Sequence, residues 1–333
     1  MHASPEYLAA RNGAVLADLG ARGRIAVRGA DRKTFLHALL TNDIALLTTG
    51  TGCYAALLTP QGRMVADMNV FELGDVTLLD VRRDVKDTVL QRFDQMIFGE
   101  DVQLGDMSGG LGCVGVYGPA AESLTGGVLA TDLTGFGPFQ NLQLERGGQP
   151  VIAARRDAMG LPGFLVFAPG DVMPGLAQEL FAAGAVILPP EVAETLRVEA
   201  GEPAFLVDMD GDTIPTEAGI EATAVSYLKG CFPGQEVLVR IRDRGHGKVV
   251  RKLVGLRIDG DTVPAAGASI AGGGKEIGRV TSAVMSPSAG RPVALGYVHR
   301  DFVEPGTAVT IAAGDASLPA TVVELPFVRE PRG

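Results

Sequence analysis

The sequence contains no tryptophan and few aromatic residues or cysteines. Aromatic residues make up 5% of the 333 residues, and the three cysteines, Cys53, Cys113 and Cys231, lie far apart in the chain. An odd number of widely separated cysteines argues against a disulfide framework, and no two of them have the spacing of a zinc site. We therefore expect reduced thiols, a cytoplasmic location and no metal centre.

Long apolar runs are also missing. Uncharged stretches such as residues 107–121 are interrupted by glycines and a proline, whereas a membrane-spanning helix needs about 20 apolar residues. The first residues lack the basic and apolar blocks of a signal peptide. We expect a protein that makes no membrane contact.

The net charge is −10, which argues against a protein that coats nucleic acid. One local cluster departs from this balance, because residues 240–252 carry a net charge of +5. Three interpretations stay open for this cluster: a solvated linker, a clamp in which Arg240 or Arg242 binds an anionic ligand tail, or direct tRNA contact. No aromatic residues interleave with the basic ones, which disfavours RNA.

What the sequence does contain is a mixture of helical and strand patterns over its first two thirds. Apolar spacing and turn residues predict helices near 31–40, 84–97, 119–124, 172–183 and 190–200, and strands near 24–28, 54–58, 63–71, 112–117 and 164–167. The turn 59–62, with Pro60 and Gly62, joins two of these strands into a hairpin. Asp67 and Asn69 then share one face of the returning strand, because strand side chains alternate.

The pattern changes after about residue 248. Short strands are expected at 249–258, 277–284, 293–298, 308–312 and 320–324, separated by turn residues. The sequence thus predicts an α+β protein in which residues 1–245 form two mixed α/β subdomains and residues 246–333 form a small β-barrel or sandwich.

Three generic motifs fail on their context. The glycines of 110–115 fit a dinucleotide loop but lead into a strand, and 272–275 fits a hairpin turn better than a phosphate loop. The acidic residues of 208–212 lack the glycine and glutamate of a calcium loop, so a solvated acidic loop is expected.

The most informative segment is Lys229-Gly230-Cys231-Phe232-Pro233-Gly234-Gln235-Glu236. Cys231 lies between two glycines and near Lys229, in a turn that can begin a helix. A nearby lysine and helix-terminal amides both favour the thiolate. A buried structural cysteine is the alternative, since free cysteines are often buried.

This octapeptide resembles the K-G-C-[FY]-x-G-Q-E signature of the YgfZ-type folate-binding proteins, relatives of the glycine-cleavage T-protein. The resemblance extends over about residues 13–300 and includes the segments 27–43, 58–67, 116–119 and 197–201. It implies two α/β subdomains and a C-terminal β-barrel around a central channel that binds tetrahydrofolate or a derivative.

The resemblance also implies roles for individual residues. Asp67 matches the catalytic aspartate of the T-protein, and Glu199 matches its pterin-binding glutamate, since a carboxylate can accept the paired donors of a pterin edge. Cys231 is expected to be the second catalytic residue. T-proteins need no thiol in this segment, whereas a thiolate beside folate suits cluster, sulfur or redox chemistry. The expected ligand-binding set is Glu199, Asp67, Asn69, Lys229, Gln235, Arg240 and Arg242.

Two functions follow from these roles. The first is a monomeric accessory factor for iron–sulfur cluster synthesis or repair, and thereby for tRNA modification, with iron–sulfur client or assembly proteins as partners. The second is a folate-dependent aminomethyltransferase, which Asp67 keeps open. On the strength of Cys231, the sequence favours the accessory factor.

Overall fold

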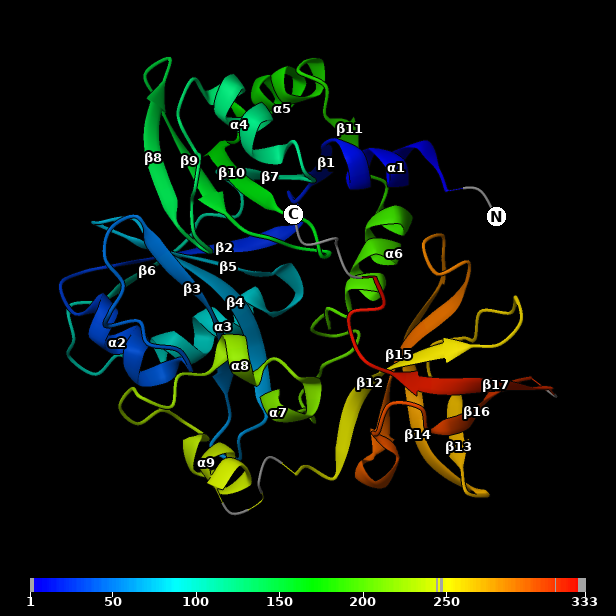
Figure 1. Ribbon diagram of the computed structural model, residues 1–333. Coiled ribbons are helices and arrows are strands. Elements are labelled where there is room, and N and C mark those ends of the chain that lie inside the picture. The colour runs from blue at the N-terminus through cyan, green and yellow to red at the C-terminus, as the bar shows by residue number, and fades with distance from the viewer. Residues whose placement is uncertain (1–2, 244, 246–247, 315, 329–333) are drawn as a thin grey trace.

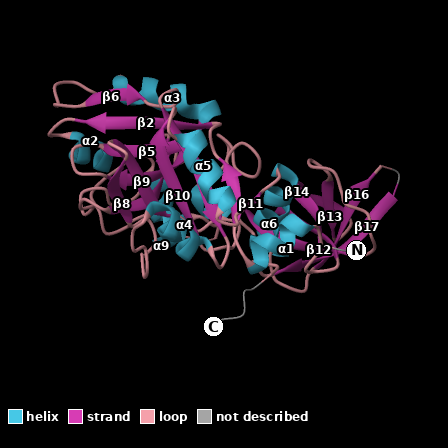
Figure 2. Cartoon of the chain, turned by 90° about the horizontal axis from the view of Figure 1, so that it is seen from above, coloured by secondary structure: helices cyan, strands magenta, loops and turns pink. Residues whose placement is uncertain are grey.

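The computed structural model describes residues 3–243, 245, 248–314 and 316–328. The chain forms two α/β subdomains that lie one above the other in Figure 1, and a barrel beside them. Seen from above, in Figure 2, the barrel lies at the opposite end of the molecule from strands β2 and β6 of the first subdomain.

The first subdomain is a five-stranded antiparallel sheet in the order β3-β4-β5-β2-β6, with two helices. Its core is made by alternate side chains of the strands and by apolar residues of α3 such as Val89 and Phe93, which are fully buried. The elements are β2 (Arg22–Arg28), α2 (Arg32–Leu39), β3 (Thr51–Leu58), β4 (Met64–Glu72), β5 (Thr77–Arg82), α3 (Arg83–Asp94) and β6 (Gln103–Asp106).

The second subdomain has a six-stranded sheet in the order β11-β1-β7-β10-β9-β8. The chain contributes β1 to this sheet before it builds the first subdomain, so the two subdomains are interleaved in sequence. Phe71 of β4 packs edge-on against Phe167 of β10, with ring centroids 5.9 Å apart. The elements are α1 (Pro5–Asn12), β1 (Val15–Asp18), β7 (Leu111–Tyr117), α4 (Ala121–Leu129), β8 (Asn141–Arg146), β9 (Gln149–Arg155), β10 (Gly163–Pro169), α5 (Met173–Ala182) and β11 (Val186–Ile187).

Four further helices connect the subdomains to the barrel. The first, α6, lies between the second subdomain and the barrel (Figure 1) and ends as predicted at Gly201, whose φ of 71° is favourable for glycine. The helices are α6 (Pro190–Ala200), α7 (Pro215–Ala218), α8 (Glu221–Ala224) and α9 (Gln235–Asp243).

The C-terminal unit is a closed six-stranded barrel in the order β12-β15-β14-β13-β16-β17. Gly273 and Gly274, both with positive φ, form the predicted hairpin turn between β13 and β14. The sequence missed β13, which is only four residues long and contains one large apolar side chain, Ile270. The elements are β12 (Arg251–Ile258), β13 (Ser269–Gly272), β14 (Lys275–Ser286), β15 (Arg291–His299), the 3-10 turn η1 (Arg300–Phe302), β16 (Ala308–Ala313) and β17 (Ala316–Val323).

The predicted fold class, two mixed α/β subdomains followed by a β-barrel, is confirmed. The predicted boundary between residues 245 and 246 adjoins residues 244 and 246–247, which lie outside the described residues, and stays a prediction. None of the helices in the described part of the chain is both long enough and apolar enough to cross a bilayer.

Candidate active site

Asp67 lines a cavity to which both subdomains contribute residues. Its strand, β4, pairs with β3, where Ala56 stands opposite Asp67 and Tyr54 stands opposite Asn69. Tyr54 therefore lies two residues along the ladder from Asp67, on the same face of the sheet. The Tyr54 hydroxyl donates a hydrogen bond of 2.7 Å to Oδ2 of Asp67. Burial, together with the negative charge of Asp67, raises the pKa of Tyr54 well above its usual value, so the phenol remains a donor.

A chain of hydrogen bonds continues from Asn69 across the sheet. The Asn69 amide donates to Oδ2 of Asp80 at 2.9 Å, and Arg22 Nε donates to both Asp80 oxygens at 2.8 and 2.9 Å. From the other side, Arg156 Nε donates to Asn69 Oδ1 at 2.9 Å. Asp80 is 1% exposed. Because both ends of the Asn69 amide are bonded, its orientation is fixed.

The pKa of Arg22 reflects this arrangement. Burial alone would lower the pKa, but attraction to Asp80 and the two hydrogen bonds raise it above its ordinary value. Arg22 therefore keeps its charge, and Asp80 neutralises it.

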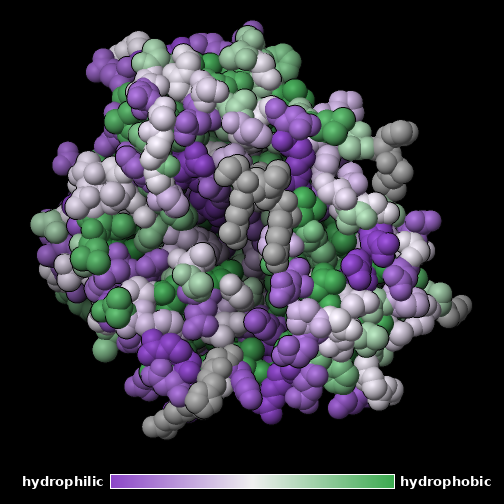
Figure 3. Space-filling view, viewed as in Figure 1, coloured by the Kyte–Doolittle hydropathy of each residue, from purple (hydrophilic) through white to green (hydrophobic). Residues whose placement is uncertain are grey.

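Two cavities meet at this network. The smaller, about 170 Å³, is lined by Tyr54, Asp67, Arg82 and Phe205, and the larger, about 760 Å³, by apolar residues that include Leu19, Tyr117, Met159 and Leu188. They have three lining residues in common: Arg22, Asn69 and Arg156. In space-filling view, hydrophilic residues gather around a hollow near the middle of the molecule (Figure 3). The larger cavity is within the usual range for a small-molecule site.

A third cavity, of about 650 Å³, lies where residues 49–51 approach residues 136–143. No titratable side chain is among its described lining residues. This cavity therefore offers neither an acid nor a base to a ligand.

Glu199 is not brought together with Asp67. Its carboxylate is fully buried at the end of α6, where the Tyr7 hydroxyl and Arg11 Nη2 each donate to Oε2 at 2.6 Å and the Ser286 hydroxyl donates to Oε1. Burial and the bond to Glu199 raise the pKa of Tyr7. These contacts tie α1 and β14 to α6, and Glu199 is not among the described residues that line the two cavities. Its role in pterin binding stays a prediction.

The predicted solvated acidic loop is wrong for Asp208, which is 3% exposed. Its carboxylate accepts hydrogen bonds from Arg197 Nη1 at 2.6 Å and from the hydroxyls of Thr281 and Ser282. Arg197 lines the larger cavity and also donates to Ser282 at 2.7 Å. Arg197 thus contacts both the larger cavity and Ser282 of the barrel strand β14.

The octapeptide packs against the first subdomain, and these contacts explain two of its residues. Lys229 is buried and donates to the carbonyl oxygens of His37 and Leu40 at the end of α2. Burial lowers the pKa of Lys229 to about 8. Cys231 is exposed and is not among the described residues lining the two cavities.

Gly234 has a positive φ of 83° and lies against the hairpin turn of residues 59–62. A Cβ at this position would lie 2.6 Å from the Thr59 carbonyl oxygen and 2.7 Å from Gly62 Cα. Only glycine allows this close approach. The glycine of the motif therefore holds the chain before α9 against the first subdomain.

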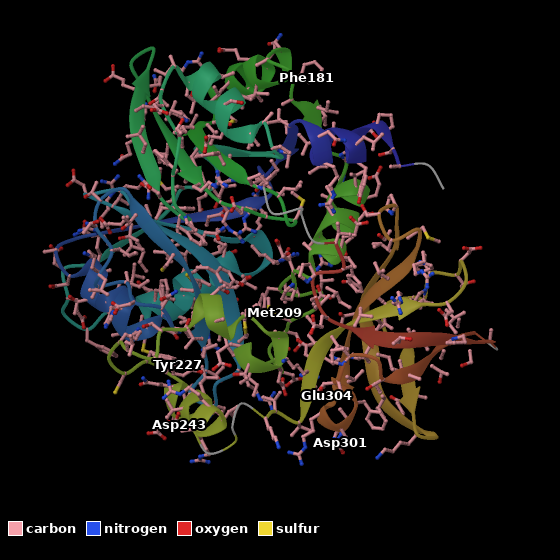
Figure 4. The ribbon with its side chains drawn as sticks, viewed as in Figure 1. Phe181, Met209, Tyr227, Asp243, Asp301 and Glu304 are labelled. Atoms are coloured by element: carbon pink, nitrogen blue, oxygen red, sulfur yellow. The ribbon has the colours of Figure 1, made fainter. Side chains whose placement is uncertain are left out.

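The remaining predicted ligand residues lie on α9, at the lower end of the molecule in Figure 1. Gln235 begins the helix and Arg240 is exposed. Arg242 stacks 4.1 Å from the ring centroid of Tyr227 and pairs with Asp243 at 2.6 Å; Figure 4 labels Tyr227 and Asp243 there. None of the three is among the described residues lining the two cavities.

Sequence reasoning missed Tyr54, Arg22, Asp80 and Arg156. Tyr54 could have been found, because the predicted hairpin places its strand beside that of Asp67. Arg156 gave no signal, because it comes from the other subdomain. Among the described residues, no group of three or more His, Cys, Asp or Glu side chains is arranged to hold a metal ion.

Comparisons with known proteins agree with this architecture. Residues 2–227 match the GCVT N-terminal domain, and residues 251–329 match the glycine cleavage T-protein C-terminal barrel domain. Among curated proteins, the chain is 34% identical to an aminomethyltransferase of Rubrobacter xylanophilus, with 98% of this chain and 86% of that protein aligned. It is 29% identical to an aminomethyltransferase of Bacillus subtilis, over 97% and 90% respectively.

A solved structure shows the same fold. The crystal structure of aminomethyltransferase T of the glycine cleavage system from Bartonella henselae superimposes with a TM-score of 0.88 at 25% identity. The superposition covers 97% of this chain and 88% of that one.

These findings overturn the accessory function favoured by the sequence. The similar proteins are aminomethyltransferases, and none of the findings supports a role in iron–sulfur clusters or tRNA modification. The physical reason is that Lys229 and Gly234 are explained by the docking of their segment onto the first subdomain, so the octapeptide is no evidence for thiol chemistry.

The interleaved subdomains, the closed barrel and the full-length matches agree, and the chain belongs to the glycine cleavage T-protein family.

Proposed function

We propose that this protein transfers the one-carbon unit of an aminomethyl group to tetrahydrofolate, with Asp67 beside the reacting nitrogen atoms. The proposal takes its reaction from the name of the similar proteins, aminomethyltransferase. The observation that supports a role for Asp67 in this reaction is its position in a cavity, where its carboxylate accepts a hydrogen bond of 2.7 Å from Tyr54.

The reaction balances without an oxidant or reductant. We take the donor to be an aminomethyl group on a lipoyl sulfur, so that its C–S and C–NH₂ bonds break while N5 and N10 of tetrahydrofolate each bond to the carbon. The protons that leave N5 and N10 pass to the sulfur and to the amine, which departs as ammonia. A positioned carboxylate serves this proton movement, and Asp67 is the carboxylate among the described lining residues of the smaller cavity.

The shape of the site supports a ligand of this kind. The cavity of about 760 Å³ has apolar and aromatic walls at Leu19, Tyr117 and Leu188, suited to a flat heterocycle. Its polar floor, with Asn69 held by Asp80 and Arg156, leads to Asp67. A tetrahydrofolate whose heterocycle occupied the larger cavity would extend the rest of the molecule toward Asp67.

The proposal gives the other predicted residues different tasks. Glu199 and Lys229 hold packed elements together, and Asn69 orients the floor of the cavity. Cytoplasmic location and a monomeric state remain part of the proposal.

The test is turnover by the purified chain. The chain is mixed with tetrahydrofolate and a lipoyl protein carrying the aminomethyl group, and both ammonia and methylene-tetrahydrofolate are measured. We expect equal amounts of the two products and no methylene product when tetrahydrofolate is left out. No enzyme-dependent product above the background reaction would disprove the proposal.

A further inference from the structure

Arg156 occupies a distinctive position in the cavity system. It follows β9 of the second subdomain, yet it lines both the cavity of Asp67 and the larger apolar cavity. Its Nε donates to Asn69 of the first subdomain at 2.9 Å. Arg156 therefore lies where the two cavities and the two subdomains meet.

No carboxylate among the described residues pairs with the charge of Arg156. Of the other two arginines in the smaller cavity, Arg22 pairs with Asp80 and Arg82 pairs with Asp84 at 2.8 Å. Arg156 forms no ion pair with any residue that the structure describes, and its Nε and Nη1 donate only to neutral oxygens. Its Nη2 makes no hydrogen bond within the described part of the chain, so the side chain keeps donor capacity where it lines the two cavities.

The surroundings hold this guanidinium in place. It lies 5.5 Å from the ring centroid of Phe139, a distance that favours a cation–π contact. Phe139 has a φ of 61°, in the left-handed region that L-residues other than glycine rarely adopt. Backbone strain of this kind often accompanies ligand sites. Met159, which lines the larger cavity, also has a left-handed φ, of 59°. Strained backbone thus occurs both beside Arg156 and in the cavity wall.

We propose that Arg156 binds a carboxylate group of the ligand at the junction of the two cavities. A guanidinium fork matches a carboxylate, and such charge-assisted bonds are strong in a partly desolvated site. This inference rests on the proposed function and extends it, because it replaces the anion clamp predicted at Arg240 or Arg242. Two sources can supply the carboxylate: the glutamyl tail of tetrahydrofolate, or a small amino acid bound beside Asp67.

Binding measurements with matched ligands test this assignment. Tetrahydrofolate, its glutamyl dimethyl ester, in which both carboxylates are neutralised, and glycine are each titrated calorimetrically into the wild type, Arg156→Gln and Arg156→Lys. Arg155→Gln is the control, because Arg155 neighbours Arg156 but pairs with Asp157 at 2.6 Å and is not among the described cavity residues. Circular dichroism establishes that each variant is folded.

If the glutamyl tail is bound, Arg156→Gln weakens tetrahydrofolate binding by about tenfold to a hundredfold and leaves binding of the dimethyl ester unchanged, and Arg156→Lys partly restores tetrahydrofolate binding. If a small amino acid is bound, Arg156→Gln weakens glycine binding instead. Equal affinities in the wild type and Arg156→Gln, an equal loss for the uncharged dimethyl ester, or no binding of any carboxylate by the wild type would each overturn the assignment. Carboxylate binding that depends on Arg156 in a protein without transferase turnover would refute only the proposed function.

Discussion

The Tyr54 hydroxyl donates to Asp67 from the neighbouring strand, at 2.7 Å and within a cavity. The bond fixes the orientation of the carboxylate and leaves its other oxygen to a ligand. Tyr54 is itself held as a neutral donor, because burial and Asp67 raise its pKa.

Tyr54→Phe is expected to reduce transferase turnover by roughly tenfold, the value of one hydrogen bond to a charged acceptor. The ring stays, so folding should be unchanged. Steady-state rates and urea unfolding of the two proteins check this together. An unchanged rate would show that the bond does not position Asp67.

Cys231→Ser is expected to leave turnover and folate binding unchanged, because Cys231 is exposed and lies outside the described lining of both cavities. The sequence pointed the other way. Turnover and folate binding are measured for Cys231→Ser and, as a control, for Cys53→Ser. A loss of either property in Cys231→Ser alone would show that the Cys231 thiol takes part in the function.

The fold was largely predictable from the sequence, whereas the site was only partly so. Local patterns located the hairpin of Asp67 and five of the six barrel strands, since alternation and turn residues are local signals. Asn69 was correctly placed on the face of Asp67. Arg156 was not found, because its bond to Asn69 joins segments that are 87 residues apart in the sequence. Asp80 was not found, because the sequence predicted no strand at β5.

The octapeptide shows a different limit. A lysine and a glycine beside a cysteine suggest an activated thiol, but Lys229 points into the first subdomain and Gly234 packs against a turn. The same residues satisfy a packing requirement that no single sequence reveals.

Gly234→Ala is expected to destabilise the protein by about 2–4 kcal/mol, because the new Cβ adds left-handed strain and overlaps Thr59 and Gly62. Gly219→Ala is the matched control: it also has a positive φ, of 77°, but no atom lies within 4 Å of its Cβ position. It should cost only the strain, about 1 kcal/mol. Urea unfolding gives both values, and equal losses would refute the packing explanation.

The lowered pKa of Lys229 makes the free energy of unfolding depend on pH. Burial lowers its pKa to about 8 in the folded protein, below its ordinary value of 10.5. The unfolded chain therefore binds more protons between these values, and the contribution of Lys229 to stability rises as the pH increases through this window.

The comparison with Lys229→Met isolates this effect. The free energy of unfolding of the wild type, minus that of the variant, should rise by on the order of 1–2 kcal/mol between pH 7 and pH 10. Urea unfolding at the two pH values measures it. A difference that does not change with pH would mean that the buried lysine keeps its ordinary pKa.

The most direct test of the account is single-turnover transfer by Asp67→Asn. The control is Asp75→Asn, the same substitution at an exposed residue in the turn between β4 and β5. If Asp67 serves the proton movement, its variant should bind tetrahydrofolate and unfold like the wild type, but transfer the one-carbon unit about 100-fold more slowly or worse, while the control is unaffected. Transfer at the wild-type rate by Asp67→Asn would contradict the account.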